Sequence, residues 1–295
     1  MRGKRFTRKR ILILTILLIF AVLLAAALDH RMVVRRYELD AAEISAPVRI
    51  VLVTDLHSCY YSEGQETLVE AVDAQSPDLV LLGGDIFDDK MDDANTERFL
   101  AGIAEKYLCY YVTGNHEYWS GAEKFAAKMA ILEKYGVTIL SGLCETIEIN
   151  GETINLCGVD DPDSYMASDI IAPPGYDDRE IEKIDTFEQQ LDTVREQSQN
   201  GNFTLLLSHR PELFESYAER GFDLVLCGHA HGGQWRIPGI LNGLYAPNQG
   251  LLPPYAGGRY ERDGVTMIVS RGLARESTIV PRVFNRPELV VVEIK

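Results

Sequence analysis

The sequence places most of its histidines in short groups with acidic residues, asparagine and glycine. His30 lies beside an apolar N-terminal segment, and the other five histidines fall within these groups. Imidazole nitrogens and carboxylate oxygens are ligands that suit Mn, Fe or Zn ions, and no cysteine cluster indicates a structural zinc site. The groups occur in the order Asp55-Leu56-His57, Gly83-Gly84-Asp85-Ile86-Phe87-Asp88, Gly114-Asn115-His116-Glu117, Ser208-His209 and Gly228-His229-Ala230-His231.

The spacing within the groups favours shared cations. In an extended segment, residues i and i+2 project to the same side, so Asp55 and His57 can bind one cation, as can His229 and His231. Asp85 has two carboxylate oxygens and can bridge two metal ions. Each motif alone is more typical of a polar turn or a buried histidine. Because all five groups follow apolar segments, the set as a whole predicts a metal site.

Apolar segments rich in β-branched residues precede the groups and alternate with helical segments. Strands are expected at residues 48–54, 79–82, 107–113, 203–207, 223–227, 265–270 and 289–294. Helices are expected near residues 67–74, 96–106, 121–135 and 179–197, and a hairpin at 146–150 and 153–158. This pattern predicts a single α/β domain whose strands end at the polar groups, and ligands bind at that edge of open α/β sheets.

In this order, the motifs D-x-H, G-D-x-x-D, G-N-H-E, S-H and G-H-x-H resemble those of the calcineurin-like metallophosphoesterase superfamily. The similarity is closest to its membrane-anchored bacterial phosphodiesterase branch and runs from about residue 49 to the C-terminus. It implies an α/β fold, a four-layer α/β/β/α sandwich, preceded here by one N-terminal transmembrane helix. The resemblance also implies a site for two divalent metal ions, Mn, Fe or Zn, between the loop ends of the two sheets.

The resemblance assigns a role to each residue of the motifs. His116 resembles the residue that meets the substrate, and Asp88 resembles the acid that orients this histidine. Glu117 is left with either a site role or a structural role. The implied metal ligands are Asp55, His57 and His231 for one ion, Asn115, His209 and His229 for the other, and Asp85 as the bridge.

The activity implied by the resemblance is hydrolysis of a phosphate ester. Two cations about 3.5–4 Å apart lower the pKa of a shared water and neutralise charge on the phosphate during in-line displacement. We expect a phosphodiester of a lipid-linked or cell-envelope substrate. A phosphomonoester is the nearest alternative. A metal-bound interaction scaffold without activity is a further alternative, although all the expected ligands and His116 are present.

The N-terminus predicts a membrane segment. Residues 1–10 contain six cations and no acid, and residues 11–28 are almost wholly apolar. As a helix, the apolar run is roughly 27 Å long, close to a hydrocarbon core of about 30 Å. The basic flank predicts a cytoplasmic n-region at 1–10, a signal anchor at 11–28, a juxtamembrane segment at 29–46 and an extracytoplasmic domain at 47–295. Cleavage after the alanines at 25–27 is the alternative and would release the domain.

Charge and cysteine content limit the partners. The formal net charge is −15, and removing the six N-terminal cations leaves −15 − 6 = −21. So acidic a chain repels polyanions, and no nucleic-acid partner is expected. The five cysteines are odd in number; Cys144 and Cys157 flank the expected hairpin and either form a bridge or, as we favour, remain buried thiols. No signal indicates an oligomeric state.

Residues 232–264 form a segment rich in glycine and proline that also holds many apolar side chains. We favour a lid that packs on its own domain, and the alternative is an apolar rim that accepts a lipid or faces the bilayer. The apolar residues of this segment are Trp235, Ile237, Ile240, Leu241, Leu244, Tyr245, Leu251, Leu252 and Tyr255.

Overall fold

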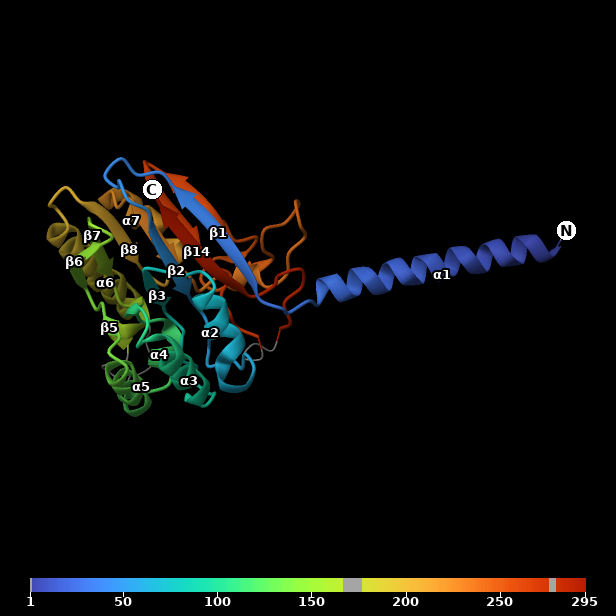
Figure 1. The fold of residues 1–295 in the computed structure, drawn as a ribbon, viewed down its shortest axis with the longest axis horizontal. Helices are drawn as coiled ribbons and strands as arrows, with labels where there is room; N and C mark the ends of the chain where they lie inside the picture. Colours follow the sequence, from blue (N-terminus) through green and yellow to red (C-terminus); the bar gives the residue numbers. More distant parts are fainter. Residues whose placement is uncertain (1, 167–176, 276–279) are drawn as a thin grey trace.

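Two six-stranded sheets form from the apolar segments and face each other in a computed structural model, which describes residues 2–166, 177–275 and 280–295 (Figure 1). The first sheet has the order β1-β14-β2-β3-β4-β5. Strands β2 to β5 are mutually parallel, β14 is antiparallel to β2, and β1 is parallel to β14. Its strands are β1 Val33–Leu39, β2 Val48–Val53, β3 Leu79–Gly83, β4 Leu108–Val112, β5 Thr138–Ile139 and β14 Glu288–Ile294.

The second sheet has the order β12-β13-β9-β8-β7-β6, with four parallel central strands and antiparallel strands at both edges. The segment expected to be a loop at 232–264 contains the edge strand β12 and a two-stranded ribbon, β10–β11. The bounds are β6 Leu143–Ile149, β7 Glu152–Gly158, β8 Phe203–Leu207, β9 Leu224–Cys227, β10 Tyr245–Ala246, β11 Gly250–Leu251, β12 Gly258–Arg262 and β13 Val265–Val269.

Helices cover the outer faces of both sheets, as the amphipathic segments predict. The α-helices are α1 Arg2–Ala27, α2 Glu66–Asp73, α3 Ala94–Ile103, α4 Asn115–Trp119, α5 Ala122–Lys134, α6 Asp177–Gln197 and α7 Phe214–Arg220. Short 3₁₀ segments are η1 Glu63–Gln65, η2 Pro162–Met166, η3 Pro211–Leu213 and η4 His231–Gly233.

Three apolar clusters define the layers. The first lies between the sheets and includes Leu52 of β2 and Leu207 of β8. A second joins the outer face of the first sheet to α2, α3 and α5, for example through Phe99. The third joins the second sheet to α6 and α7, for example through Leu191 and Tyr217. Alternate residues of each central strand therefore face different cores, and the predicted four-layer α/β/β/α sandwich is confirmed.

The N-terminal helix α1 extends away from the domain (Figure 1). Its segment Thr7–Ala27 is long and apolar enough to cross a membrane, and a signal sequence would have the same character. Met1, the first residue of the expected n-region, lies outside the described residues.

Strand β1 corrects the expected domain boundary at residue 47. The range 29–46, expected as a juxtamembrane segment, contains β1, which pairs with β14 along its whole length from Val33 to Leu39. The folded domain therefore begins before residue 47. An edge strand leaves part of its surface in water, and Arg35 and Arg36 are exposed there. These charged residues hide the strand pattern in the sequence.

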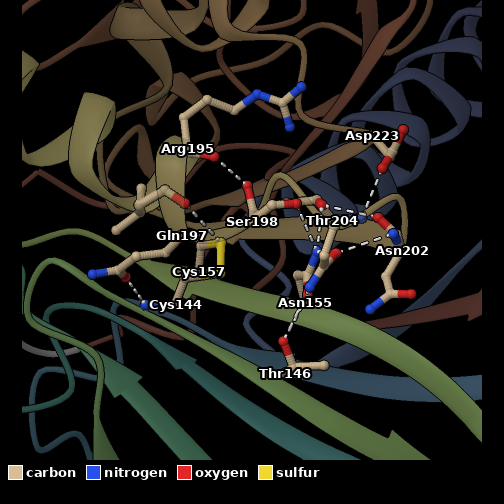
Figure 2. The surroundings of a disulfide bond; sticks show 12 residues. Cys144, Thr146, Asn155, Cys157, Arg195, Gln197, Ser198, Asn202, Thr204 and Asp223 are labelled. Carbon is tan, nitrogen blue, oxygen red and sulfur yellow. Dashed lines mark hydrogen bonds between the residues drawn. A yellow bond between two sulfur atoms is a disulfide. The ribbon is translucent and has the colours of Figure 1, made fainter.

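The two hairpin cysteines form a disulfide, so the favoured expectation of free thiols is wrong (Figure 2). Cys144 and Cys157 lie directly opposite each other in the β6–β7 pairing, with Cα atoms 3.9 Å apart. The backbone N–H of Cys144 also donates to the side-chain oxygen of Gln197 on α6, at 2.8 Å. The pairing register brings the two sulfur atoms together, and residue spacing alone does not reveal that register.

Candidate metal centre

The seven expected ligands converge at one edge of the two sheets. Asp55, Asp85 and Asn115 follow β2, β3 and β4 of the first sheet, and His209 and His229 follow β8 and β9 of the second. All seven side chains are buried; the other two are His57 and His231.

The loops that carry the ligands turn sharply. Asp55, His57, Asp85, His229 and His231 all have left-handed backbone, with φ between 46° and 64°. The expectation that the i, i+2 pairs are extended is therefore wrong. Asp55 and His57 still meet in one cluster, whereas His229 and His231 lie in different clusters. Left-handed non-glycine residues cost about 1–3 kcal/mol each and persist where the surrounding structure enforces them. Such strain at five ligands is typical of a site shaped for function.

The first cluster consists of Asp55, His57 and His231. One ligand atom from each residue lies within 4.8 Å of the others. His231 Nε2 is 3.7 Å from Asp55 Oδ1, and the rings of His57 and His231 stack with centroids 5.2 Å apart. This grouping is the one expected for the first metal ion.

The second cluster consists of Asp85, His209 and His229, again with ligand atoms within 4.8 Å of one another. Asp85 Oδ2 is 3.2 Å from His209 Nε2 and 3.6 Å from His57 Nε2 of the first cluster. The carboxylate thus lies between the two clusters. That position fits the bridging role expected of Asp85.

Unpaired atoms indicate what the residues are built to hold. Each expected ligand keeps one buried nitrogen or oxygen without a hydrogen-bond partner, and burying such atoms costs free energy unless a ligand satisfies them. Two cations would accept all these lone pairs, so the donor set fits a dinuclear centre. The atoms are Asp55 Oδ2, His57 Nε2, Asp85 Oδ2, Asn115 Oδ1, His209 Nε2, His229 Nδ1 and His231 Nδ1.

In three of the expected histidine ligands, the ring nitrogen that does not face the cluster has a hydrogen-bond partner that orients the ring. His57 Nδ1 lies 3.2 Å from Asp88 Oδ2, and His209 Nδ1 lies 2.8 Å from the carbonyl oxygen of Gly83. His229 Nε2 lies 2.9 Å from Asn248 Oδ1. Each contact places a proton on one ring nitrogen and leaves the other nitrogen free to bind a metal ion.

Electrostatics at the centre favour positive charge. Burial disfavours protonation of His209, but the carboxylates of Asp85 and Asp55 outweigh burial and raise the pKa of His209 to about 10. Burial also opposes ionisation of Asp88, yet hydrogen bonds from His57 and from backbone N–H groups lower its pKa to about 2. The carboxylates therefore make the surroundings of His209 negative, which suits divalent cations. Burial and nearby positive charges instead lower the pKa of His229 and His231, which keeps these rings neutral, the form that binds a metal ion.

His116 lies at the rim of the site, with its side chain 23% exposed. Its Nδ1 is 2.7 Å from Asp89 Oδ1 and 3.7 Å from Asp88 Oδ2. Asp89 is thus the nearer acid, and Asp88 makes its shorter contact with His57, which modifies the expected role of Asp88. The ring of Trp119 lies against His116 with centroids 4.6 Å apart.

Glu117 is a buried structural acid that joins two ligand loops. Its carboxylate accepts hydrogen bonds from the backbone N–H groups of Asp85, Ile86, Phe87 and Gly114, at 2.8–3.1 Å. Burial and the charge of Asp85 raise the pKa of Glu117 to about 7. Glu117 therefore fixes the backbone on both sides of the bridging aspartate, a role that residue type alone left open.

Comparison with known proteins identifies the fold and the motif set. Residues 48–233, more than half of the chain, match the family described as calcineurin-like phosphoesterase. The chain belongs to this family. The family has a dinuclear metal centre, in agreement with the ligand clusters described above.

This chain is 30% identical over 235 residues to an uncharacterized metallophosphoesterase of Helicobacter pylori J99, and the match covers 78% of this chain and 55% of the relative. It is 28% identical over 208 residues to the phosphodiesterase YaeI of Escherichia coli K12, covering 69% and 67%. A dimetal phosphatase structure from Danio rerio matches with 13% identity, coverage of 77% and 88%, and a TM-score of 0.48. The chain spans about half the length of the Helicobacter pylori relatives.

Beside the second cluster, the chain contains a polar network outside the family motifs. Arg210 is buried, and its guanidinium donates to both carboxylate oxygens of Asp161. Its Nη1 also donates to Asn248 Oδ1 at 2.8 Å, the same oxygen that faces His229. The position of Arg210 directly after His209 was the sole hint in the sequence, and Asn248 lies in a distant loop.

Proposed function

We propose that this chain is a dinuclear-metal phosphodiesterase, with phosphomonoester hydrolysis as the alternative. The observation that carries the proposal is the convergence of six side chains around the carboxylate of Asp85, where each of the seven residues has an unpaired buried atom. When bound, two divalent cations supply an activated water and neutralise charge on the phosphate oxygens.

The protein's own groups complete the chemistry. His116 is partly exposed and held by Asp89, so its ring can face the ester oxygen that leaves. A proton on His116 would stabilise charge on that oxygen and then transfer to it. The carboxylates of Asp89 and Asp88 both lie near its Nδ1, at 2.7 Å and 3.7 Å. Asp88 serves the site by orienting His57.

A membrane location supports a lipid-linked or cell-envelope phosphodiester as the substrate. Helix α1 has the length and composition of a span, and the basic n-region favours a cytoplasmic N-terminus and an extracytoplasmic domain. The disulfide Cys144–Cys157 supports this orientation, because disulfides persist in oxidising compartments. A diester is supported by the name of the Escherichia coli relative, a phosphodiesterase. We therefore propose a single-pass cell-membrane protein that retains its anchor.

The test uses the full chain in detergent micelles, loaded in turn with Mn, Fe, Zn and Mg. Hydrolysis of bis-p-nitrophenyl phosphate is compared with that of p-nitrophenyl phosphate. We expect kcat/KM for the diester to exceed that for the monoester. The reverse ratio would support a phosphomonoesterase, and a fully loaded protein without turnover of either ester would support a scaffold.

A further inference from the structure

An apolar surface remains uncovered beside the metal centre. The loop that follows η4 packs on its own domain through Ala246, Pro253 and Ala256, as a lid would. Six other apolar side chains of this loop point outward, with exposed fractions up to 84%. For these six, the favoured expectation of a lid packed on its own domain is wrong. These six define the docking loop, residues 235–252: Trp235, Ile237, Ile240, Tyr245, Leu251 and Leu252.

The docking loop is attached to the segment that holds the end of α1. The Trp235 ring N–H donates to the carbonyl oxygen of Pro281 at 3.0 Å, and the Arg236 N–H donates to that of Val283 at 2.9 Å. The N–H of Phe284 donates to the carbonyl oxygen of Ala27, the last residue of α1, at 2.7 Å. The loop therefore lies on the side of the domain from which α1 extends (Figure 1).

The metal centre lies at this same end of the domain. Strand β1, which follows α1, is parallel to β14, and β14 is antiparallel to β2. The start of β1 therefore lies at the edge where β2, β3 and β4 end and where the ligands begin. Asn285, next to Phe284, donates to the carbonyl oxygen of His231 at 2.7 Å. Two hydrogen bonds and one peptide bond therefore link the end of α1 to His231, an expected ligand of the first cluster.

The composition of the loop suits a bilayer better than a protein partner. Residues 232–260 contain two arginines and no Asp or Glu, although the whole chain has 44 acidic residues. Trp and Tyr are enriched at membrane–water interfaces, where their rings sit at headgroup level. Trp235 and Tyr245 are both outward-facing members of the docking loop.

We propose that the docking loop inserts into the membrane that α1 spans and holds the metal centre at headgroup level. The phosphodiester is then a lipid taken from the bilayer rather than a solute. This inference rests on the membrane anchor of the proposed function and names its substrate class.

The first test measures the depth of the loop in full-length protein reconstituted into phosphatidylcholine nanodiscs. The chain has two tryptophans, so Trp119→Phe leaves Trp235 as the sole reporter and Trp235→Phe leaves Trp119. Lipids brominated in the acyl chain quench fluorophores that enter the hydrocarbon. We expect quenching of Trp235 to exceed that of Trp119 about threefold or more, and equal quenching would overturn the proposal.

The second test separates docking from catalysis. Hexadecyl p-nitrophenyl phosphate in the nanodisc is compared with methyl p-nitrophenyl phosphate in solution. In both, water supplies the new oxygen on phosphorus and p-nitrophenolate leaves. The triple variant Ile240→Asp, Leu251→Asp, Leu252→Asp should lose about tenfold or more on the lipid diester and stay within about twofold on the soluble one.

The matched control is Leu108→Asp, an exposed leucine at the start of β4, at the opposite edge of the sheet from the metal centre. It should leave both activities unchanged. A triple variant that keeps its activity on the lipid diester, or that loses both activities equally, would overturn the proposal that the docking loop inserts into the membrane. A parent chain that does not remain with the nanodisc would overturn both the membrane anchor and the insertion of the docking loop. Hydrolysis of the soluble diester by the same chain would still support the phosphodiesterase activity.

Discussion

Replacing Glu117 with glutamine tests whether this buried acid holds the ligand loops in place. Its two carboxylate oxygens accept four backbone N–H groups, from Asp85, Ile86, Phe87 and Gly114. Glutamine keeps one oxygen and turns an NH₂ group toward two of these donors. A hydrogen bond to a charged group contributes about 1.5–3 kcal/mol, and because the pKa of Glu117 is about 7, its carboxylate carries this charge above neutral pH, where the comparison is made. Losing two of these hydrogen bonds should lower the free energy of unfolding by about 3–6 kcal/mol in Glu117→Gln. This is a large share of the roughly 5–15 kcal/mol typical of a domain.

Urea unfolding of the full chain in detergent, followed by tryptophan fluorescence, measures this difference. The matched control is Glu123→Gln, the same change at an exposed position in the first turn of α5. The control should change the free energy of unfolding by less than about 0.5 kcal/mol. A Glu117→Gln variant that loses less than about 1 kcal/mol would show that the four hydrogen bonds do not hold the loops, and the reasoning would fail.

Three further predictions concern the site and its frame. His116→Ala should retain both metal ions but lose about 10²–10⁴ in kcat on a phosphodiester, because it removes proton transfer and not a ligand. Gly114→Ala would place a Cβ 2.2 Å from Asp85 Oδ1, so metal content measured by elemental analysis should fall. Replacing Cys144 and Cys157 with alanine should lower the free energy of unfolding by about 3 kcal/mol, because it opens a loop of 13 residues.

Each of these predictions has a result that contradicts it. An His116→Ala enzyme within a few-fold of the parent would remove this histidine from the mechanism. For Gly114→Ala the control is Gly121→Ala, which strains a left-handed backbone (φ 85°) but adds a Cβ that meets no atom within 4 Å. Equal metal content in both variants would argue against crowding at Asp85. Unchanged stability after loss of the cysteines, or after reduction of the parent, would mean that the disulfide does not constrain the unfolded chain.

The sequence predicted most of the fold because its central strands are buried on both faces. Apolar runs such as the one ending at Val53 have few alternatives to a central strand, and Asp55 and His57 follow directly. Strand β1 was missed because it lies at an edge and carries the exposed Arg35 and Arg36. A pattern based on burial detects such strands poorly.

The sequence predicted the seven residues that the structure brings together, but it did not predict the residues that support them. Every ligand belongs to a short local motif, whereas Asn248 and Asp161 meet Arg210 through loops far apart in the chain. Adjacent acids are also hard to distinguish by type: the backbone turn after β3 decides that Asp89 rather than Asp88 lies nearest His116. Such contacts depend on loop geometry, which includes left-handed residues that spacing does not encode.

Metal content per chain tests the central claim most directly. Elemental analysis of the full-length protein, after loading with Mn and removal of unbound ions, should give two metal ions per chain. The same analysis of Asp85→Asn should give about one or fewer, because this carboxylate lies between both clusters. A parent protein that holds less than one ion, or an Asp85→Asn variant that still holds two, would contradict a dinuclear centre bridged by Asp85.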